Sequence, residues 1–273
     1  MGVLPDGNLR WHCYFGNGEE DETGGTGWHH NSGNTIGRGW HGFSHLVGVT
    51  DGIILGVDGH GDLKWHRYQG MGEQDPTGGT GWHQNSGNRI GNGFNSFKHI
   101  FAYPIFAPEE LGAHQIFGVE LDGNLRWYGY MGNGEDDVTG NTGWHPKSRT
   151  FIGNGWNGFQ FLVAGGGAHF GVPQGGPNSG NLLYFKYIGK GDGDVSGAIG
   201  FTENSGNPIG QVWNGFKHLF AAGHPGGHGG SRLYGIEQDG KLRFYNYIGH
   251  GESNVSGNTG FTANSGNRIG RGW

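Results

Sequence analysis

The sequence lacks the features that mark several classes of protein. Its 273 residues include one cysteine, Cys13, so an internal disulfide is excluded, and a zinc site would need further thiolate or imidazole ligands. No run of about 18 apolar residues is present to span a bilayer. The first residues, MGVLPDGNLRW, have neither a basic stretch nor the apolar core of an export signal. We therefore expect a soluble chain, not inserted in a membrane, that is either secreted or cytoplasmic.

Clusters of basic side chains are also missing. Lys and Arg number 17 against 23 Asp and Glu, which gives a formal net charge of −6, and no segment forms a basic stripe. A nucleic-acid-binding surface neutralises phosphates with such clusters. The sequence therefore predicts no nucleic-acid partner.

Helical periodicity is a third absence. No segment repeats apolar residues at helical spacing over a useful length, and a glycine in a helix interior costs about 1 kcal/mol, a penalty that 64 glycines would multiply. Aromatic residues are abundant, with ten Trp, ten Tyr and 17 Phe, which is enough apolar surface to build a core. These features predict a folded, all-β protein with many tight turns.

Five copies of one segment follow one another along the chain. Each contains an alternating apolar stretch after a DG-like turn, and the copies begin at Asn8, Asp62, Asn124, Asn181 and Lys241. From the tyrosine that ends this stretch to the isoleucine of the next IG pair the distance is 22 residues in every copy. A segment of constant length predicts packed structure or a shared site, whereas the variable segments between copies are typical of surface loops.

Each copy contains the signals of four short strands. In the last copy these are FKHLFA (216–221), LYGIEQ (233–238), LRFYNY (242–247) and the end of TGFTANSGNRIG (259–270), with a DG hairpin turn between the second and third. Repeats of this length with four strands each are typical of propeller blades. We therefore expect one domain, residues 1–273, that forms a five-bladed β-propeller of four-stranded antiparallel blades.

The first copy is shorter than the others. Its GVLPDG matches the end of a second strand, GIEQDG, so three strands are predicted there and four in each later copy, nineteen in all. Propellers usually close by building one blade from both chain ends, which hides the sheet edges. We expect such a closing blade, short of one strand, with the open position left incomplete, completed by sequence outside this chain, or covered by a second molecule.

A glycine-rich signature recurs between the copies: IGRGWHGFSHLVG, IGNGFNSFKHIFA, IGNGWNGFQFLVA and IGQVWNGFKHLFA. In these stretches the chain resembles the tachylectin-type lectins, and the resemblance covers nearly the whole sequence. It implies a five-bladed propeller that binds glycans on cell surfaces or glycoproteins, N-acetylated hexosamines among them. The family has an Asp-Asn pair before the blade tryptophan, whereas this chain has GTGW, GTGW, NTGW, AIGF and NTGF, so the architecture transfers better than the sugar preference.

A polar run follows one aromatic residue in each copy, and four of the five runs contain NSGN. Sugars need an apolar plate for their C–H face and paired donors and acceptors for their hydroxyls. The predicted sugar-binding residues are Trp28, His29, Asn31, Trp82, His83, Asn85, Trp144, His145, Phe201, Asn204, Phe261 and Asn264. The alternative is that NSGN is a tight turn and the aromatic residue belongs to the core between blades.

Acidic residues recur in the glycine-rich loops that precede these aromatics. They are Glu19, Glu73, Glu135, Asp192 and Glu252, and Asp21, Asp75, Asp137 and Asp194. Calcium prefers several oxygen ligands on a flexible loop, so a calcium site is one interpretation, and acidic turns on a solvated rim are the other. We expect no cofactor.

Nearly every candidate residue is present four or five times. Catalysis needs groups with unlike pKa values at one centre, whereas a ring of repeats places like groups in equivalent environments. The repetition therefore favours a multivalent binding protein over an enzyme. A glycosidase with one central acid pair and a scaffold for protein interactions are the alternatives.

Overall fold

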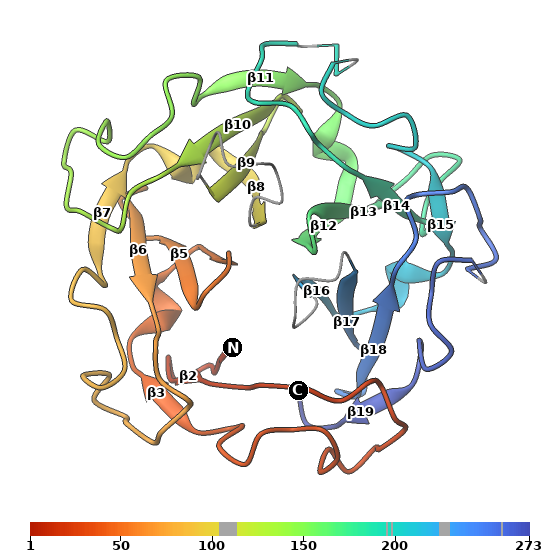
Figure 1. Ribbon diagram of the computed structural model, residues 1–273, viewed down its shortest axis with the longest axis horizontal. Helices are drawn as coiled ribbons and strands as arrows, with labels where there is room; N and C mark the ends of the chain where they lie inside the picture. Colours follow the sequence, from red (N-terminus) through yellow and green to blue (C-terminus); the bar gives the residue numbers. More distant parts are fainter. Residues whose placement is uncertain (104–113, 195, 198, 224–229, 258) are drawn as a thin grey trace.

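The computed structural model describes residues 1–103, 114–194, 196, 197, 199–223, 230–257 and 259–273. The described residues form nineteen strands in five antiparallel sheets, arranged as blades around a central axis (Figure 1). Within the described part of the chain, no helix is long and apolar enough to cross a membrane. The predicted all-β, five-bladed propeller is confirmed.

We number the blades in chain order. Blade 1 contains β1 (Gly2–Val3), β2 (Leu9–Arg10) and β3 (Thr35–Gly37). Blade 2 contains β4 (His45–Gly48), β5 (Ile53–Val57), β6 (Leu63–Arg67) and β7 (Asn88–Gly91). Blade 3 contains β8 (Phe97–Tyr103), β9 (His114–Glu120), β10 (Leu125–Tyr130) and β11 (Thr150–Gly153). Blade 4 contains β12 (Phe159–Gly165), β13 (Ala168–Pro173), β14 (Leu182–Phe185) and β15 (Pro208–Gly210). Blade 5 contains β16 (His218–Gly223), β17 (Ser231–Ile236), β18 (Leu242–Tyr247) and β19 (Arg268–Gly270).

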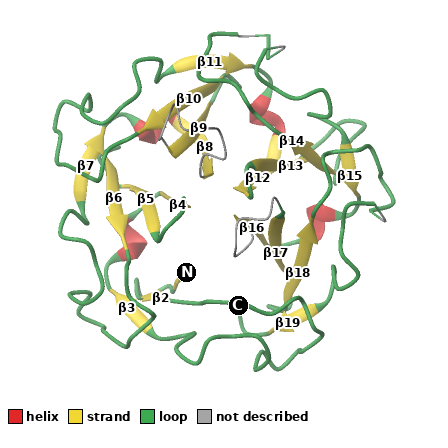
Figure 2. Cartoon of the chain, viewed as in Figure 1, coloured by secondary structure: helices red, strands yellow, loops and turns green. Residues whose placement is uncertain are grey.

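Within each of blades 2 to 5 the first strand lies nearest the axis and the fourth lies at the rim (Figure 1). A single 3₁₀ turn links each rim strand of blades 1 to 4 to the next inner strand, and Figure 2 shows these turns between the blades. The turns are η1 (Trp40–Gly42), η2 (Phe94–Ser96), η3 (Trp156–Gly158) and η4 (Trp213–Gly215).

The composition of blade 1 corrects one expectation. Its sheet has the order β1-β2-β3 and contains residues 2 to 37 alone, while β19 belongs to blade 5. The prediction that the closing blade is assembled from both chain ends is therefore wrong. The prediction of three strands in the first copy, four in each later copy and nineteen in all is confirmed.

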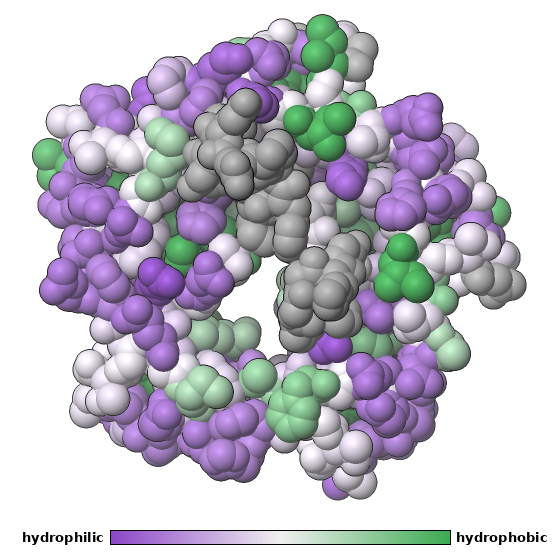
Figure 3. Space-filling model, viewed as in Figure 1, coloured by the Kyte–Doolittle hydropathy of each residue, from purple (hydrophilic) through white to green (hydrophobic). Residues whose placement is uncertain are grey.

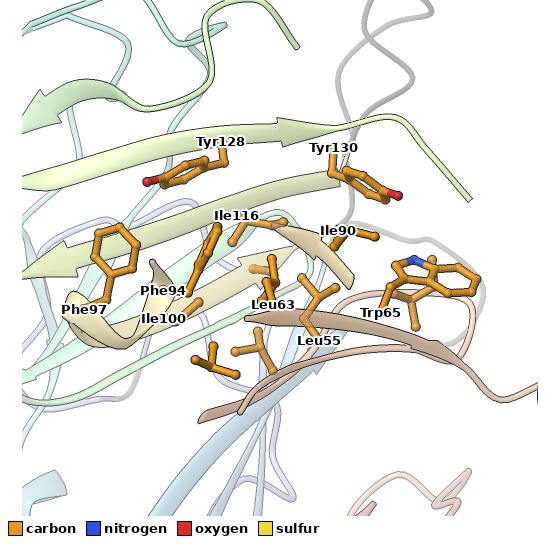
Figure 4. Packing of buried hydrophobic residues seen from close by; sticks show 14 residues of the cluster. Leu55, Leu63, Trp65, Ile90, Phe94, Phe97, Ile100, Ile116, Tyr128 and Tyr130 are labelled. Carbon is orange, nitrogen blue, oxygen red and sulfur yellow. The ribbon is translucent and has the colours of Figure 1, made fainter. Parts of the chain in front are cut away.

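The core lies between neighbouring blades. Alternate residues of each strand face one side of the sheet, so every blade presents apolar side chains to both neighbours. Figure 4 shows the cluster between blades 2 and 3, where Leu63 and Trp65 lie near Ile116 and Tyr130, all fully or almost fully buried. An equivalent cluster joins Tyr14 of blade 1 to blade 5, so core packing runs through all five junctions.

Candidate functional site

A pocket lies between blades 2 and 3, and its parts come from both blades. Blade 2 contributes Gly91 of β7 and Phe94 of η2, and blade 3 contributes Tyr128 of β10 and the half-buried Trp144. The pocket has a volume of about 230 Å³. It exists because the 22-residue segment of one copy folds back over the rim strand of the copy before it.

Paired aromatic rings form its wall. The Phe94 and Trp144 rings are stacked, with centroids 6.2 Å apart and an interplanar angle of 27°, and Tyr128 lies 5.8 Å from Trp144. The Trp144 indole donates a hydrogen bond to the carbonyl of Ile90 in blade 2, at 2.7 Å. The same ring is thus a wall of the pocket and a contact between the blades.

An equivalent aromatic pair recurs at every junction, stacked at four of them and tilted by 35° between Trp28 and Trp273. Centroid distances are 5.3 Å for Trp40 and Trp82, 5.7 Å for Trp156 and Phe201, 6.1 Å for Trp213 and Phe261, and 5.5 Å for Trp273 and Trp28. The indole bond recurs where the second ring is Trp, from Trp28 to the Ile269 carbonyl and from Trp82 to the Ile36 carbonyl. The two phenylalanine copies keep the apolar plate without this donor.

Polar groups face the pocket between blades 2 and 3 from Asn141, His145, Ser148 and Arg149. The Nδ1 atom of His145 accepts a hydrogen bond from the backbone N–H of Lys147 at 3.2 Å, and its ring packs edge-on against Trp127. A neutral imidazole that accepts at Nδ1 carries its proton on Nε2, where it is a donor. The pocket therefore combines an apolar plate with donors and acceptors around it.

The pocket between blades 3 and 4 has a different polar lining. It measures about 290 Å³. Phe201 and Thr202 stand in place of the Trp and His of the previous junction, and Ser205 keeps its serine. The two hydroxyls of Thr202 and Ser205 lie 3.3 Å apart and share a hydrogen bond. Glu203 adds a carboxylate to the lining.

A third pocket lies between blades 5 and 1 and measures about 850 Å³. Trp28, His29, His12 and Trp273 line it at the positions that correspond to the smaller pockets. Burial, with the nearby N-terminal amine and Arg10, lowers the pKa of His12 to about 4. His12 is therefore neutral near pH 7 and presents a hydrogen-bonding group, not a cation, to the pocket.

Sequence reasoning missed one variable residue, which lies on the third strand of blades 2 to 5 and shortly after β2 in blade 1. It is His12, His66, Tyr128, Phe185 or Tyr245, according to the blade, and each packs against the aromatic pair of its junction. Burial lowers the pKa of His66 to about 4 and raises the pKa of Tyr128 to about 12. No signal in the sequence separated it from the buried aromatic residue just before it, which also varies between copies.

The aromatic of the IG signature was also missed as a site residue. Trp156 and Trp273 line the two pockets that follow blades 3 and 5, and Phe94 lines the pocket that follows blade 2. Its recurrence in the sequence marked it as part of the fold. Only the pairing with the next copy reveals that it also faces a pocket.

The predicted aromatic and histidine residues occupy the pocket positions. Trp28, His29, Trp144, His145 and Phe201 line the three pockets. The residues Trp82, His83 and Phe261 hold the same places in the two other junctions, stacked on or beside the equivalent rings.

The predicted asparagines lie elsewhere. In each case Nδ2 donates to a backbone carbonyl in the acidic loop of the next blade: Asn31 to Met71 at 2.8 Å, Asn85 to Asn133 at 2.9 Å, Asn204 to His250 at 3.0 Å and Asn264 to Asn17 at 3.0 Å. The last asparagine of each NSGN does the same, as Asn88 does to Gly134 at 2.9 Å. We call these bonds the asparagine clasp. They favour the turn interpretation of NSGN.

The third copy replaces the clasp with an ion pair. Lys147 stands where the other copies have the first asparagine, and its ammonium pairs with Asp192 in the loop of blade 4. The replacement joins the same two blades, which indicates that this position serves the junction in every copy.

The acidic loops use their carboxylates to hold their own backbone. Asp75 accepts hydrogen bonds from the N–H groups of Thr77 and Thr80 at 2.9 and 2.7 Å, and Glu73 accepts one from Met71 at 2.8 Å. Bonds from the Thr77 hydroxyl and from Thr80 hold the pKa of Asp75 well below its usual range. Among the described residues no group of three His, Cys, Asp or Glu side chains is arranged to hold a metal ion.

The family model of the tachylectins matches residues 2–273, which include all five blades. No curated protein matches the chain. The match agrees with the five-bladed propeller and with the glycine-rich signature at every junction. The chain belongs to the tachylectin family.

Proposed function

We propose that the protein is a multivalent lectin whose glycan-binding sites are the pockets between neighbouring blades. The observation that carries the proposal is the repeated pairing of a half-buried aromatic plate with hydrogen-bonding groups, as at Trp144 and His145. A sugar ring packs its C–H face on such a plate and directs its hydroxyls to the polar groups. The tachylectin family is a lectin family, which supports the same conclusion.

The junctions fall into two groups with different polar linings. Three present Trp followed by His, and two present Phe followed by Thr. We propose that both groups bind glycans, with N-acetylated hexosamines as the first candidates, and that they differ in affinity for any one sugar. Several weak sites on a rigid ring gain about 10² to 10⁴ in avidity on a surface that bears many glycans.

The linings favour binding over hydrolysis. Glycosidases place two carboxyl groups about 5 to 10 Å apart across the scissile bond. Of the residues that line the three pockets, Glu203 is the one carboxylate.

The test is calorimetric titration of the protein with N-acetylglucosamine, N-acetylgalactosamine and fucose, followed by variants of one site. His145→Thr converts the lining of blade 3 to the residue type of blades 4 and 5. The number of sites that bind with the affinity of the Trp-His junctions should therefore fall by one. The fold should be unchanged, because Thr202 and Thr262 occupy that place in two other blades.

Asn85→Ala is the matched control. If the asparagine clasp holds only the junction, this variant lowers stability and leaves the number of sites unchanged. If Asn85 contacts the sugar, as the sequence predicts, one site is lost. Absence of binding to every glycan on an array, or full binding after His145→Thr and Trp144→Phe together, would refute the proposed pockets.

A further inference from the structure

One copy of the polar turn has an arginine where the other four copies have a glycine. Arg149 has a φ of 77°, in the left-handed region that favours glycine. The equivalent glycines have φ values of 91° to 96°, and they are Gly33, Gly87, Gly206 and Gly266. Non-glycine residues held in this strained conformation cluster at binding and active sites. The third copy therefore keeps the turn and adds a side chain that the other copies lack.

The backbone of this turn makes the same contacts with glycine as with arginine. The N–H of Arg149 donates to the carbonyl of Trp127 at 2.8 Å, and the glycine makes the equivalent bond in the other four copies. The carbonyl of Arg149 accepts a hydrogen bond from the Arg126 guanidinium at 2.7 Å. In blade 5 the carbonyl of Gly266 accepts the equivalent bond from Arg243 at 2.5 Å. The packing of the turn therefore does not require the Arg149 side chain.

Arg149 lies at the aromatic wall of the pocket between blades 2 and 3. It lines that pocket together with Tyr128 and Trp144. At the equivalent Gly206 a Cβ atom would lie 4.0 Å from the ring of Phe185, the residue that corresponds to Tyr128. Burial raises the pKa of Tyr128, and the positive charge of Arg149 is among the influences that oppose this rise. A side chain at this position is thus directed toward the wall and not away from it.

The guanidinium of Arg149 brings an uncompensated positive charge to this pocket. Its two basic neighbours are paired, Arg126 with Glu120 at 2.7 Å and Lys147 with Asp192. Among the described residues, no hydrogen bond or ion pair engages the Arg149 guanidinium. None of the described residues that line the pocket is an Asp or a Glu. The pocket therefore presents a positive charge to a ligand.

The pocket between blades 3 and 4 has the opposite charge. Glu203 lines it, and its described lining residues include neither Lys nor Arg. Gly206 stands there in the place of Arg149. The two pockets therefore share an aromatic plate and differ in the charge that they present.

A guanidinium is suited to the anionic groups that some sugars carry. Its planar fork donates two parallel hydrogen bonds to a carboxylate or to a tetrahedral oxyanion such as sulfate. The aromatic wall packs against the C–H face of the same sugar ring. Figure 3 shows mainly hydrophilic residues on the rim over blades 2 and 3, so the surroundings of the pocket are polar as well.

We propose that the pocket between blades 2 and 3 selects sugars that carry a carboxylate or sulfate group. The Arg149 guanidinium binds this group while the sugar ring packs on Trp144. The selection rests on the proposed function, since it concerns one of the same glycan-binding pockets. The four junctions with glycine at this position lack this contact.

The experiment compares ligands that differ only in the anion. Calorimetric titration of the whole protein uses N-acetylglucosamine against its 6-sulfate, and N-acetylneuraminic acid against its methyl ester. One site should bind the anionic member of a pair at least about tenfold more tightly, as expected for a charge-assisted hydrogen bond. The pair that shows the preference identifies the anion as sulfate or carboxylate. Added salt should weaken the binding of the anionic ligand alone.

Three variants locate the contact. Arg149→Gly restores the residue of the other copies and should abolish the preference for the anion. Gly87→Arg introduces a guanidinium beside Trp82 and His83, where a Cβ atom meets nothing within 4 Å, and should create a second site with this preference. Lys147→Asn is the control, because it removes the same charge from the same turn at a residue that does not line the pocket. It should leave the preference unchanged.

The outcomes separate this selection from glycan binding itself. Equal affinity for both members of each pair, or a preference that survives Arg149→Gly, would overturn the selection alone, because neutral sugars would still bind. A folded Gly87→Arg variant without a second such site would also overturn it. The same loss of preference after Lys147→Asn would assign the effect to the general charge of the turn and not to Arg149. Absence of binding to every ligand would refute the proposed function and the selection together.

Discussion

Val212 holds a backbone conformation that a β-branched residue rarely adopts. It immediately precedes Trp213 at the start of η4, with φ 68° and ψ 29°, in the left-handed region. The equivalent residues Gly39, Gly93 and Gly155 have φ values of 80°, 75° and 79°. We predict that Val212→Gly stabilises the protein.

The magnitude follows from three contributions. The left-handed conformation costs an L-residue about 1–2 kcal/mol, with a β-branched residue at the upper end. Glycine loses more backbone freedom on folding, which offsets about 0.5–1 kcal/mol of that gain. The Val212 side chain is 75% exposed, so its removal forfeits little burial. The net expectation is about 1 kcal/mol of added stability, or a melting temperature about 2–4 °C higher.

Calorimetric or denaturant unfolding of matched variants measures this change in the free energy of unfolding. Gly155→Val should lose about 1 kcal/mol, because a Cβ atom at Gly155 meets no neighbour and only the backbone conformation is tested. Val138→Gly is the control for loss of an exposed valine, since Val138 is 64% exposed and has a negative φ. If Val212→Gly lowers the stability, or shifts it as Val138→Gly does, the strain argument is refuted.

Two other predictions concern packing and pH. Gly118→Ala places a Cβ atom 2.7 Å from the Phe97 ring and should lower the free energy of unfolding by about 1–3 kcal/mol. At Gly2 a Cβ atom meets no neighbour within 4 Å, so Gly2→Ala should be neutral or stabilising. Equal losses of stability in thermal unfolding would contradict this prediction. Burial lowers the pKa of His66 to about 4 and that of His169 to about 3. Both lie below the unfolded value of about 6.5, so stability is fully present above that pH and falls toward pH 4. The urea midpoint should therefore decrease from pH 7 to 4.5, and less steeply in His169→Phe; a constant midpoint would exclude this linkage.

The blades were predictable from the sequence because the strand signals are local. Alternation in segments such as LRFYNY, and the DG turn before it, depend on residues close together in the chain. Five copies of the pattern then determine the number of blades, and the structure confirms this count. The missing inner strand of blade 1 was predictable in the same way, by alignment of GVLPDG with GIEQDG.

The site was less predictable because its parts belong to different copies. The sequence marks Trp144 and Asn85 equally, as residues of the same constant segment, yet Trp144 faces a pocket while Asn85 bonds to the carbonyl of Asn133 in the next blade. Which side of a junction a turn residue faces depends on how neighbouring repeats pack together. The sequence of a single repeat does not determine that packing. The expected closing blade was wrong for a related reason, because contacts between repeats, and not strand pairing, close the ring. Trp273 packs on Trp28, and Asn264 bonds to the carbonyl of Asn17, so the two ends of the chain are in contact without a shared sheet.

The five junctions are alike in contacts but unlike in the length of chain that they enclose. The indole bond from Trp82 to Ile36 closes a loop of 46 residues, whereas that from Trp28 to Ile269 closes one of 241. The entropy lost on loop closure grows with the logarithm of loop length, so the junction between blades 5 and 1 costs about 1.5 kcal/mol more to form. That junction is therefore the weakest of the five. Its amide protons should exchange with solvent before those of the other junctions, and the ring should open there before any blade unfolds.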